Sequence, residues 1–225
     1  LAQAFFFLWI KESLLNLGKI LHRDEADLVA ELRQNMLNQG LNLYEDIQII
    51  KISSGTAGQI EISVEIGGKE QTISGSHLLV ATGRKVNIDK LNLSAAGIEH
   101  TSRGIQVDEC LRTSNKKVFA IGDVAGGYQF THIAGYHAGV VIRNIIFRQR
   151  AKVNYQAVPW VTYTYPELAH VGLLESEAQN KYSGNITISE FEHKENDRAQ
   201  AERALHGKIK LITTKKGKVL GVSIL

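Results

Sequence analysis

The sequence has 225 residues, of which 44% are hydrophobic and 22% charged, a composition typical of one or two soluble globular domains. The net charge of +3 is small, and Lys and Arg are spread along the chain, which argues against nucleic-acid binding. Cys110 is the single cysteine, which excludes a disulfide or a two-cysteine redox motif within these residues. The apolar start, Leu1–Ile10, is too short to span a bilayer, so no membrane association is expected.

The beginning of the chain predicts a parallel α/β layer, because helix and strand patterns alternate. We expect a core helix over Leu1–Ile10, cut open at its start, and a short strand over Ile10–Leu17. A second helix has Asp24 as N-cap and Gly40 as C-cap. The apolar positions at helical spacing in this helix, and the strand residues after it, are Leu28, Leu32 and Met36, then Leu41, Leu43 and Ile47–Ile52.

A β-meander is expected next. Gln59–Ile66 alternates apolar and polar residues and meets Gln71–Ile73 across Gly67-Gly68, a pair that permits the positive φ of a tight hairpin. The continuous apolar run His77–Ala81 then predicts a strand covered on both faces, ending at Thr82-Gly83.

Beyond this run we expect a short strand at Ile105–Val107 and a second buried strand at Val118–Ile121, which stops at Gly122-Asp123. A helix is predicted from about Thr131 to Phe147, with a face of small residues formed by Ala134, Gly135, Ala138 and Gly139. From Lys152 onward the pattern favours an antiparallel α+β domain. Its expected strands are Val158–Tyr163, Ile186–Phe191, Lys208–Thr213 and an unfinished Val219–Ile224, with one helix near Glu175–Asn180.

Asp123 is the sharpest chemical signal. Ligands of open parallel sheets bind just beyond the carboxyl ends of strands, and a carboxylate there can accept hydrogen bonds from the vicinal hydroxyls of a sugar or ribitol chain. The helix that begins near Thr131 and His132 offers free N–H groups and a positive dipole end. On local pattern alone the commoner outcome is a tight turn in which the aspartate caps the next segment, and Ala81-Thr82-Gly83 has the same plain alternative.

Taken together in order, several motifs resemble the class I pyridine nucleotide-disulfide oxidoreductases. Their combination is far more specific than any one of them. The segments that carry the resemblance are His77–Arg84, Val107–Glu109, Leu111–Ser114, Val118–Asp123, Gln129–Ala134, Val158–Trp160, Pro166-Glu167 and Val171-Gly172.

The resemblance implies an α/β architecture made of remnants of FAD- and NAD(P)-binding Rossmann-like domains with a β-meander, followed by an α+β interface domain. It implies an NAD(P)-binding part at 1–85, an FAD-binding part at 86–150 and a homodimer interface at 151–225. Ala81, Thr82 and Gly83 would lie near the nicotinamide and flavin, and Gly122-Asp123 would hold the ribitol and phosphate region of FAD. The residues expected to border the flavin are Gln129, Phe130, Thr131, His132 and Ala134.

The family also implies a cytoplasmic enzyme that passes hydride from NAD(P)H to FAD and onward to a cysteine pair that reduces a small molecule or a disulfide. The Phe130-Thr131-His132 motif favours a mercuric-reductase-like or glutathione-reductase-like member over a dihydrolipoamide dehydrogenase. The glycine-rich FAD and NAD(P) motifs and the cysteine pair belong upstream of Leu1 in this family, and the catalytic His-Glu pair belongs after Leu225. We therefore assign no catalytic residue and expect the chain alone to be colourless or weakly occupied by FAD, because half of the FAD-binding surface is missing.

The coenzyme, a metal site and an alternative function are the remaining questions that the residues address. Trp9 stands at a turn position that usually prefers glycine, and Asn16 lies near where an acid or a base would select NAD or NADP, so the coenzyme stays open. The eight histidines show no metal-ligand spacing and are interpreted as surface or packing residues, with no metal site. The alternative function is a non-catalytic remnant or dimerisation module that has lost its cofactors.

Overall fold

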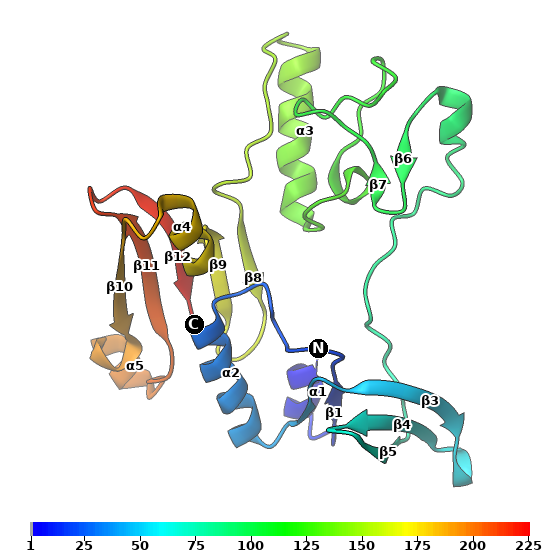
Figure 1. Ribbon diagram of the computed structural model, residues 1–225, viewed down its shortest axis with the longest axis vertical. Coiled ribbons are helices and arrows are strands. Elements are labelled where there is room, and N and C mark those ends of the chain that lie inside the picture. The colour runs from blue at the N-terminus through cyan, green and yellow to red at the C-terminus, as the bar shows by residue number, and fades with distance from the viewer. Residues whose placement is uncertain (1) are drawn as a thin grey trace. The chain divides into compact units, whose positions relative to one another are not determined.

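The structure is a computed structural model that describes residues 2–225. The chain divides into two compact units. The larger unit joins Leu1–Leu79 to Gln156–Leu225, and the smaller unit is Val80–Tyr155. Figure 1 colours the first part of the larger unit blue to cyan, the smaller unit green, and the last part yellow to red.

The larger unit begins with a small α/β layer. The elements are α1 (Ala2–Phe7), β1 (Ser13–Leu15), α2 (Ala26–Gln39) and β2 (Asn42–Tyr44), and β1 and β2 pair in parallel. The helical spacing in α2 is confirmed, since Leu28, Leu32 and Met36 lie in one buried cluster together with Leu168 and Leu225. This cluster fixes α2 beside the second half of the unit.

Of the two predicted caps of α2, only the C-terminal one is confirmed. Gly40 is the C-cap, with the left-handed φ of 100° that glycine adopts at little cost. Asp24 as N-cap is wrong, because its carboxylate instead accepts a hydrogen bond from Nε1 of Trp160 at 2.8 Å. Glu25 is the N-cap residue by backbone conformation, and its side chain does not cap the helix.

The expected core helix at the amino end is only partly present. A helix forms over Ala2–Phe7, but Leu8 and Trp9 follow it as exposed residues, and the Trp9 side chain is 98% accessible. Trp9 has a φ of 62°, which explains why its turn position favours glycine. Within α1 the buried residue is the polar Gln3, which hydrogen-bonds Gln39 and the backbone of Tyr165.

The predicted meander is present. β3 (Gln48–Ser54), β4 (Ile60–Ile66) and β5 (Lys69–Gly75) form an antiparallel sheet with β4 in the centre. Gly67 and Gly68, with φ of 58° and 77°, make the turn between β4 and β5. Ile62 and Val64 of β4 form a small core with Ile47, which precedes β3.

The strand expected at His77–Ala81 is wrong. Residues 77–81 have no regular secondary structure, and the side chain of Val80 is 67% accessible. A strand covered on both faces needs hydrogen-bonded neighbours, and the parallel sheet of the described chain consists of β1 and β2 alone. Apolar character without a pairing partner does not make a strand.

The last part of the larger unit is the antiparallel α+β domain that the sequence indicates. Its sheet has the order β10-β11-β12-β9-β8 (Figure 1), and α4 (Glu175–Tyr182) follows β9. The sequence patterns did not predict the strand β9 (Leu168–Gly172), the 3-10 helix His193–Glu195 or the helix α5 (Asp197–Glu202). The remaining strands are β8 (Pro159–Thr162), β10 (Ile186–Glu192), β11 (Lys208–Thr214) and β12 (Val219–Ile224).

A buried ion cluster joins the two halves of the larger unit. The ammonium of Lys210 in β11 lies 2.7 Å from a carboxylate oxygen of Asp27, 3.0 Å from Glu175 and 3.6 Å from Glu25. The side chains of Lys210 and Glu25 are only 5% and 6% accessible. The cluster therefore links α2, α4 and the antiparallel sheet through charges that are largely removed from water.

The smaller unit contains little regular structure. Its elements are a hairpin of β6 (His100–Thr101) and β7 (Gly104–Ile105) and the long helix α3 (Thr131–Ile145). A hydrophobic core is formed by Val86, Ile88, Leu93, Ile98, Ile105 and Ala120. The strand expected at Ile105–Val107 is thus displaced and shorter. The buried strand expected at Val118–Ile121 is wrong, because this segment forms a single bridge from Phe119 to Arg112 and leaves Ile121 exposed.

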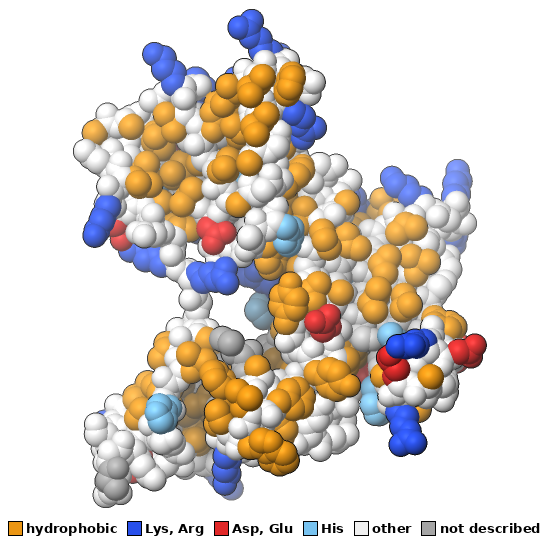
Figure 2. All heavy atoms as spheres, turned by 180° about the vertical axis from the view of Figure 1, so that it is seen from behind, with side chains coloured by type: hydrophobic (Ala, Val, Ile, Leu, Met, Phe, Trp, Pro, Cys, Tyr) orange, Lys and Arg blue, Asp and Glu red, His pale blue; other side chains and the backbone are white. Residues whose placement is uncertain are grey.

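Many large apolar side chains remain accessible on both units, and Figure 2 shows them as broad orange areas on the face that it presents. On α3 the exposed set is Ile142, Ile145 and, just beyond the helix, Ile146 and Phe147. Gly135 and Gly139 of the predicted small-residue face also border open space. Across residues 2–225, none of the helices combines the length and the apolar character needed to cross a membrane.

Candidate functional site

The turn at Gly122-Asp123 is held tightly against α3. Gly122 has a φ of 68°, and a Cβ at this position would lie 3.0 Å from the Cβ of Ala134. Glycine is therefore favoured for two reasons, the left-handed φ and the close approach that a Cβ would make to Ala134. The 3-10 turn Gly122–Ala125 follows directly, closed by the hydrogen bond from Gly126 N–H to the carbonyl of Asp123.

The side chain of Asp123 is exposed, and within residues 2–225 its carboxylate makes neither a hydrogen bond nor an ion pair. It does not cap the following helix, so the plain alternative of a capping aspartate does not describe it. Asp108 offers a contrast in the same unit, because its carboxylate accepts hydrogen bonds from the N–H groups of Cys110 and Arg112 at 2.9 Å. Asp108 thus closes a loop, whereas the carboxylate of Asp123 is available to accept hydrogen bonds from a ligand.

The amino end of α3 provides a second polar feature. Its N-cap residue is Phe130, whose side chain cannot accept the hydrogen bonds of the first helical turn. The N–H groups of Thr131 and His132 are consequently at an uncapped, positive helix end. A helix end of this kind favours an electron-rich or anionic group.

Aromatic rings line the approach to this helix end. Tyr128 stacks on Phe130 with centroids 5.9 Å apart, and Phe130 stacks on His132 at 5.3 Å with an interplanar angle of 8°. Tyr155 contacts Tyr128 edge to face at 5.7 Å. The cluster gives the uncapped helix end a flat aromatic border.

Ala81, Thr82 and Gly83 are exposed and have no regular secondary structure. The next residue, Arg84, donates a hydrogen bond from Nη1 to the carbonyl of Gln129 at 3.0 Å. This hydrogen bond ties the residue that follows the predicted segment 81–83 to the first residue of the predicted segment 129–132. Among the other predicted residues, Ala134 packs against Gly122.

His137 and Tyr155 were not singled out as site residues from the sequence. The His137 side chain is 1% accessible, and its Nδ1 accepts a hydrogen bond from Gly122 N–H at 3.0 Å. Its Nε2 lies 2.8 Å from the hydroxyl of Tyr155. Burial lowers the pKa of His137 and raises the pKa of Tyr155. No local motif signals this link, because it joins residues in the turn, the helix and the segment after the helix.

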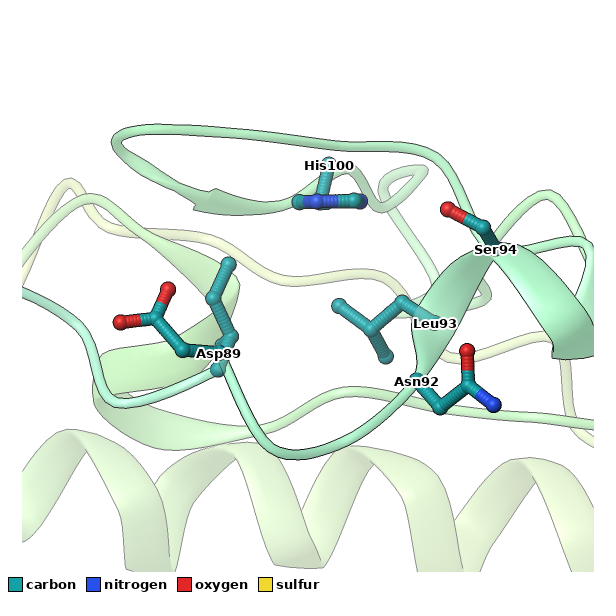
Figure 3. Close-up of a pocket in the computed structure, with 6 residues that line it drawn as sticks. Asp89, Asn92, Leu93, Ser94 and His100 are labelled. Carbon is teal, nitrogen blue, oxygen red and sulfur yellow. The ribbon is translucent and has the colours of Figure 1, made fainter.

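Two shallow hollows also lie in the smaller unit. One, of about 290 Å³, is bordered by Asp89, Leu93 and His100, and Figure 3 shows these side chains arranged around it. The other, of about 210 Å³, lies between the β6-β7 hairpin and the loop at Gly126-Gly127. The predicted site residues border neither of these hollows.

Comparison with known proteins gives consistent matches over most of the chain. Residues 13–138 match the family described as pyridine nucleotide-disulphide oxidoreductase, and residues 158–225 match its dimerisation domain. A mercuric reductase from Bacillus cereus is 36% identical over 210 residues, covering 92% of this chain and 33% of the relative. A dihydrolipoyl dehydrogenase from Staphylococcus aureus is 35% identical over 198 residues, covering 87% of this chain and 42% of the relative.

Among solved structures, the HOCl-induced flavoprotein disulfide reductase RclA from Escherichia coli matches with a TM-score of 0.84 and 25% identity, over 95% of this chain and 48% of that one. LpdA from Mycobacterium tuberculosis, at 21% identity and a TM-score of 0.89, shares the fold. The chain spans between a third and a half of the length of these relatives.

Proposed function

The chain belongs to the pyridine nucleotide-disulphide oxidoreductase family, and on that premise we propose that it forms part of an FAD- and NAD(P)-dependent disulfide reductase. In the whole protein, hydride would pass from NAD(P)H to FAD and onward to a cysteine pair that lies outside these 225 residues. The identities to mercuric reductase and dihydrolipoyl dehydrogenase differ by one percentage point, so the mercuric-reductase-like assignment rests on Phe130-Thr131-His132.

The observation that carries this proposal is the carboxylate of Asp123 at the Gly122 turn, which has no partner in the described part of the chain. Ribitol hydroxyls are donors that an ionised carboxylate binds through charge-assisted hydrogen bonds. A tight turn with no Cβ at Gly122 holds Asp123 close to the start of α3, since Gly122 contacts Ala134 in the first turn of that helix. The chemistry of the turn therefore fits the polyol part of a flavin.

We assign the flavin ring to the uncapped end of α3, with the N–H groups of Thr131 and His132 as donors and Phe130 and Gln129 beside them. Bound FAD would supply the hydride-accepting and electron-transferring chemistry. The residues of this chain would orient it and would favour negative charge on the ring through the helix dipole. Ala81, Thr82 and Gly83 would border the nicotinamide side.

In domain terms we assign residues 1–85 to NAD(P) binding, 86–150 to FAD binding and 151–225 to a homodimer interface. The match of 158–225 to the family's dimerisation domain supports the last assignment. Sedimentation equilibrium of the 225-residue chain should give twice the chain mass of 24.9 kDa. A monomer at concentrations of tens of micromolar would remove the dimer from the proposal.

The flavin assignment is tested by titrating FAD into the chain and measuring the quenching of flavin fluorescence. We expect weak binding, and Asp123→Ala should weaken it roughly ten- to hundredfold, the effect of losing a hydrogen bond to a charged group. Asp89→Ala is the matched control, because Asp89 is also an exposed aspartate of the smaller unit and pairs only with Lys85 among the described residues. Its affinity should equal that of the unmodified chain.

Equal affinities of all three proteins would remove Asp123 from the cofactor site. A chain that dimerises but binds no FAD would favour the second candidate function, a cofactor-free dimerisation module. The observation that supports this candidate is the match of residues 158–225 to the family's dimerisation domain, which contains the antiparallel sheet β10-β11-β12-β9-β8.

A further inference from the structure

We propose that His137 is a positioning residue: as a neutral ring protonated on Nε2, it holds the Gly122-Asp123 turn in the conformation that presents Asp123. The structural part of this inference concerns the turn alone. Its consequence for FAD rests on the proposed function.

The two hydrogen bonds of His137 define its tautomer. Gly122 N–H can only donate, so Nδ1 of His137 carries a lone pair. A neutral imidazole then has its proton on Nε2, which donates to the hydroxyl oxygen of Tyr155 at 2.8 Å. Because both ring nitrogens are used, His137 connects the turn to the segment after α3.

The bond to Gly122 has no substitute in the turn. Gly122 is buried, and its N–H is the donor that faces the helix. The contact with Ala134 restricts the turn sterically but supplies no acceptor. Loss of the His137 acceptor would leave a buried donor unsatisfied, which costs more than the bond itself contributes.

Tyr155 extends this support to the aromatic cluster. Its ring contacts Tyr128 and Tyr136 edge to face at 5.7 and 6.5 Å, and the Tyr136 hydroxyl accepts a hydrogen bond from Asn154 N–H at 2.7 Å. His137 thus joins the Asp123 turn to the rings beside the amino end of α3.

Acid should weaken this arrangement. The titratable groups next to the ring are Tyr136 on α3 and Tyr155 after it, with Tyr128 packed against Tyr155. Asp123, on the turn that the ring supports, is exposed. Burial lowers the pKa of His137, so the stabilisation is complete above its ordinary value of 6.5 and decreases as the pH falls toward the lowered folded value. Protonation of Nδ1 would remove the acceptor for Gly122.

The test uses the 225-residue chain without cofactor. Nitrogen-15 shifts of the His137 ring report the tautomer, and amide hydrogen exchange of Gly122, normalised to the intrinsic rate at each pH, reports the bond. His137→Leu should speed Gly122 exchange about ten- to hundredfold. His137→Asn, whose Oδ1 can stand near the position of Nδ1, should restore most of the protection and make it independent of pH between 5 and 7. Tyr155→Phe should change it little.

A ring protonated on Nδ1, or equal Gly122 exchange in His137→Leu and the unmodified chain, would overturn the inference. Equal loss in the Leu and Asn variants would reduce His137 to a packing residue and would overturn it too. FAD titration then separates the two proposals. If exchange behaves as expected and His137→Leu also loses FAD affinity while His137→Asn keeps it, both stand; if FAD binds none of the proteins, only the cofactor assignment fails.

Discussion

Replacing Lys210 with methionine should destabilise the larger unit by about 3 kcal/mol, the lower end of the range for removing one partner of a buried ion pair. The main cost arises at Glu25, whose carboxylate lies 3.6 Å from the Lys210 ammonium and is itself 6% accessible. After the substitution this buried charge would keep only the hydrogen bond from Glu175 N–H, at 2.7 Å. Asp27 and Glu175 are more exposed, and Asp27 retains Lys208, so they add little.

The assay is urea unfolding followed by the fluorescence of Trp160, which lies in the larger unit and donates to Asp24. The measurements use a Trp9→Phe background, which removes the second tryptophan at an exposed position. Lys194→Met is the control, because Lys194 pairs with Glu192 on the surface of the same unit, where both side chains are more than half exposed, and its loss should leave the unfolding midpoint unchanged.

A second variant isolates the buried charge. Adding Glu25→Gln to Lys210→Met removes the uncompensated carboxylate and should recover part of the lost stability, giving a coupling energy between Lys210 and Glu25. The reasoning is refuted if Lys210→Met costs less than about 1 kcal/mol. It is also refuted if the double variant loses as much unfolding free energy as the two single variants together, or more.

The remaining predictions concern the same unit. Leu28→Ala should cost about 3 to 5 kcal/mol in urea unfolding, since this α2 side chain is fully buried; a cost below 1 kcal/mol would mean that α2 does not pack as described. Gly172→Ala should destabilise far more than Gly217→Ala on thermal unfolding, because both have positive φ but only at Gly172 would a Cβ overlap backbone, that of Leu220; equal shifts in Tm would contradict this. Burial alone would raise the pKa of Asp27, but hydrogen bonds from two lysines outweigh it and lower the pKa. Its stabilisation is therefore present above the ordinary value of 3.8 and is lost as the pH falls through the lowered folded value, so the unfolding midpoint of Asp27→Asn should depend less on pH below 4 than that of the unmodified chain.

The parts of the fold that the sequence predicts are those whose signals are local. The spacing of Leu28, Leu32 and Met36 is sufficient to predict α2. The pair Gly67-Gly68 determines the hairpin of β4 and β5 through its backbone conformation. Residues 77–81 and 118–121 fail for the opposite reason, because an apolar run becomes a strand only when other strands pair with it.

The unexpected helix α5 has a local signal in the sequence. Asn196 precedes it, and its side chain accepts hydrogen bonds from the N–H groups of Arg198 and Ala199, which is the pattern of an asparagine N-cap. β9 is different, since its five residues become recognisable only through their pairing with β8 and β12.

For the candidate site, the sequence indicates the turn and the helix but not what joins them. Gly122 and Asp123 stand out as a glycine and a carboxylate after an apolar run, and α3 stands out by its length. The role of His137 depends on a hydrogen bond across fifteen residues, which only the folded chain brings together. Local patterns can identify functional groups, while their support comes from tertiary contacts.

The most direct test of the central assignment is a titration of the nitrogen-15-labelled chain with FAD, followed through backbone amide shifts. We predict that the amides of Asp123, Thr131 and His132 shift together and saturate and that those of β10 and β11 stay unchanged. In Asp123→Ala the shifts of Thr131 and His132 should need roughly ten- to hundredfold more FAD. Shifts that cluster away from the Gly122-Asp123 turn and the start of α3, or that keep the same midpoint in Asp123→Ala, would contradict a flavin site at this turn.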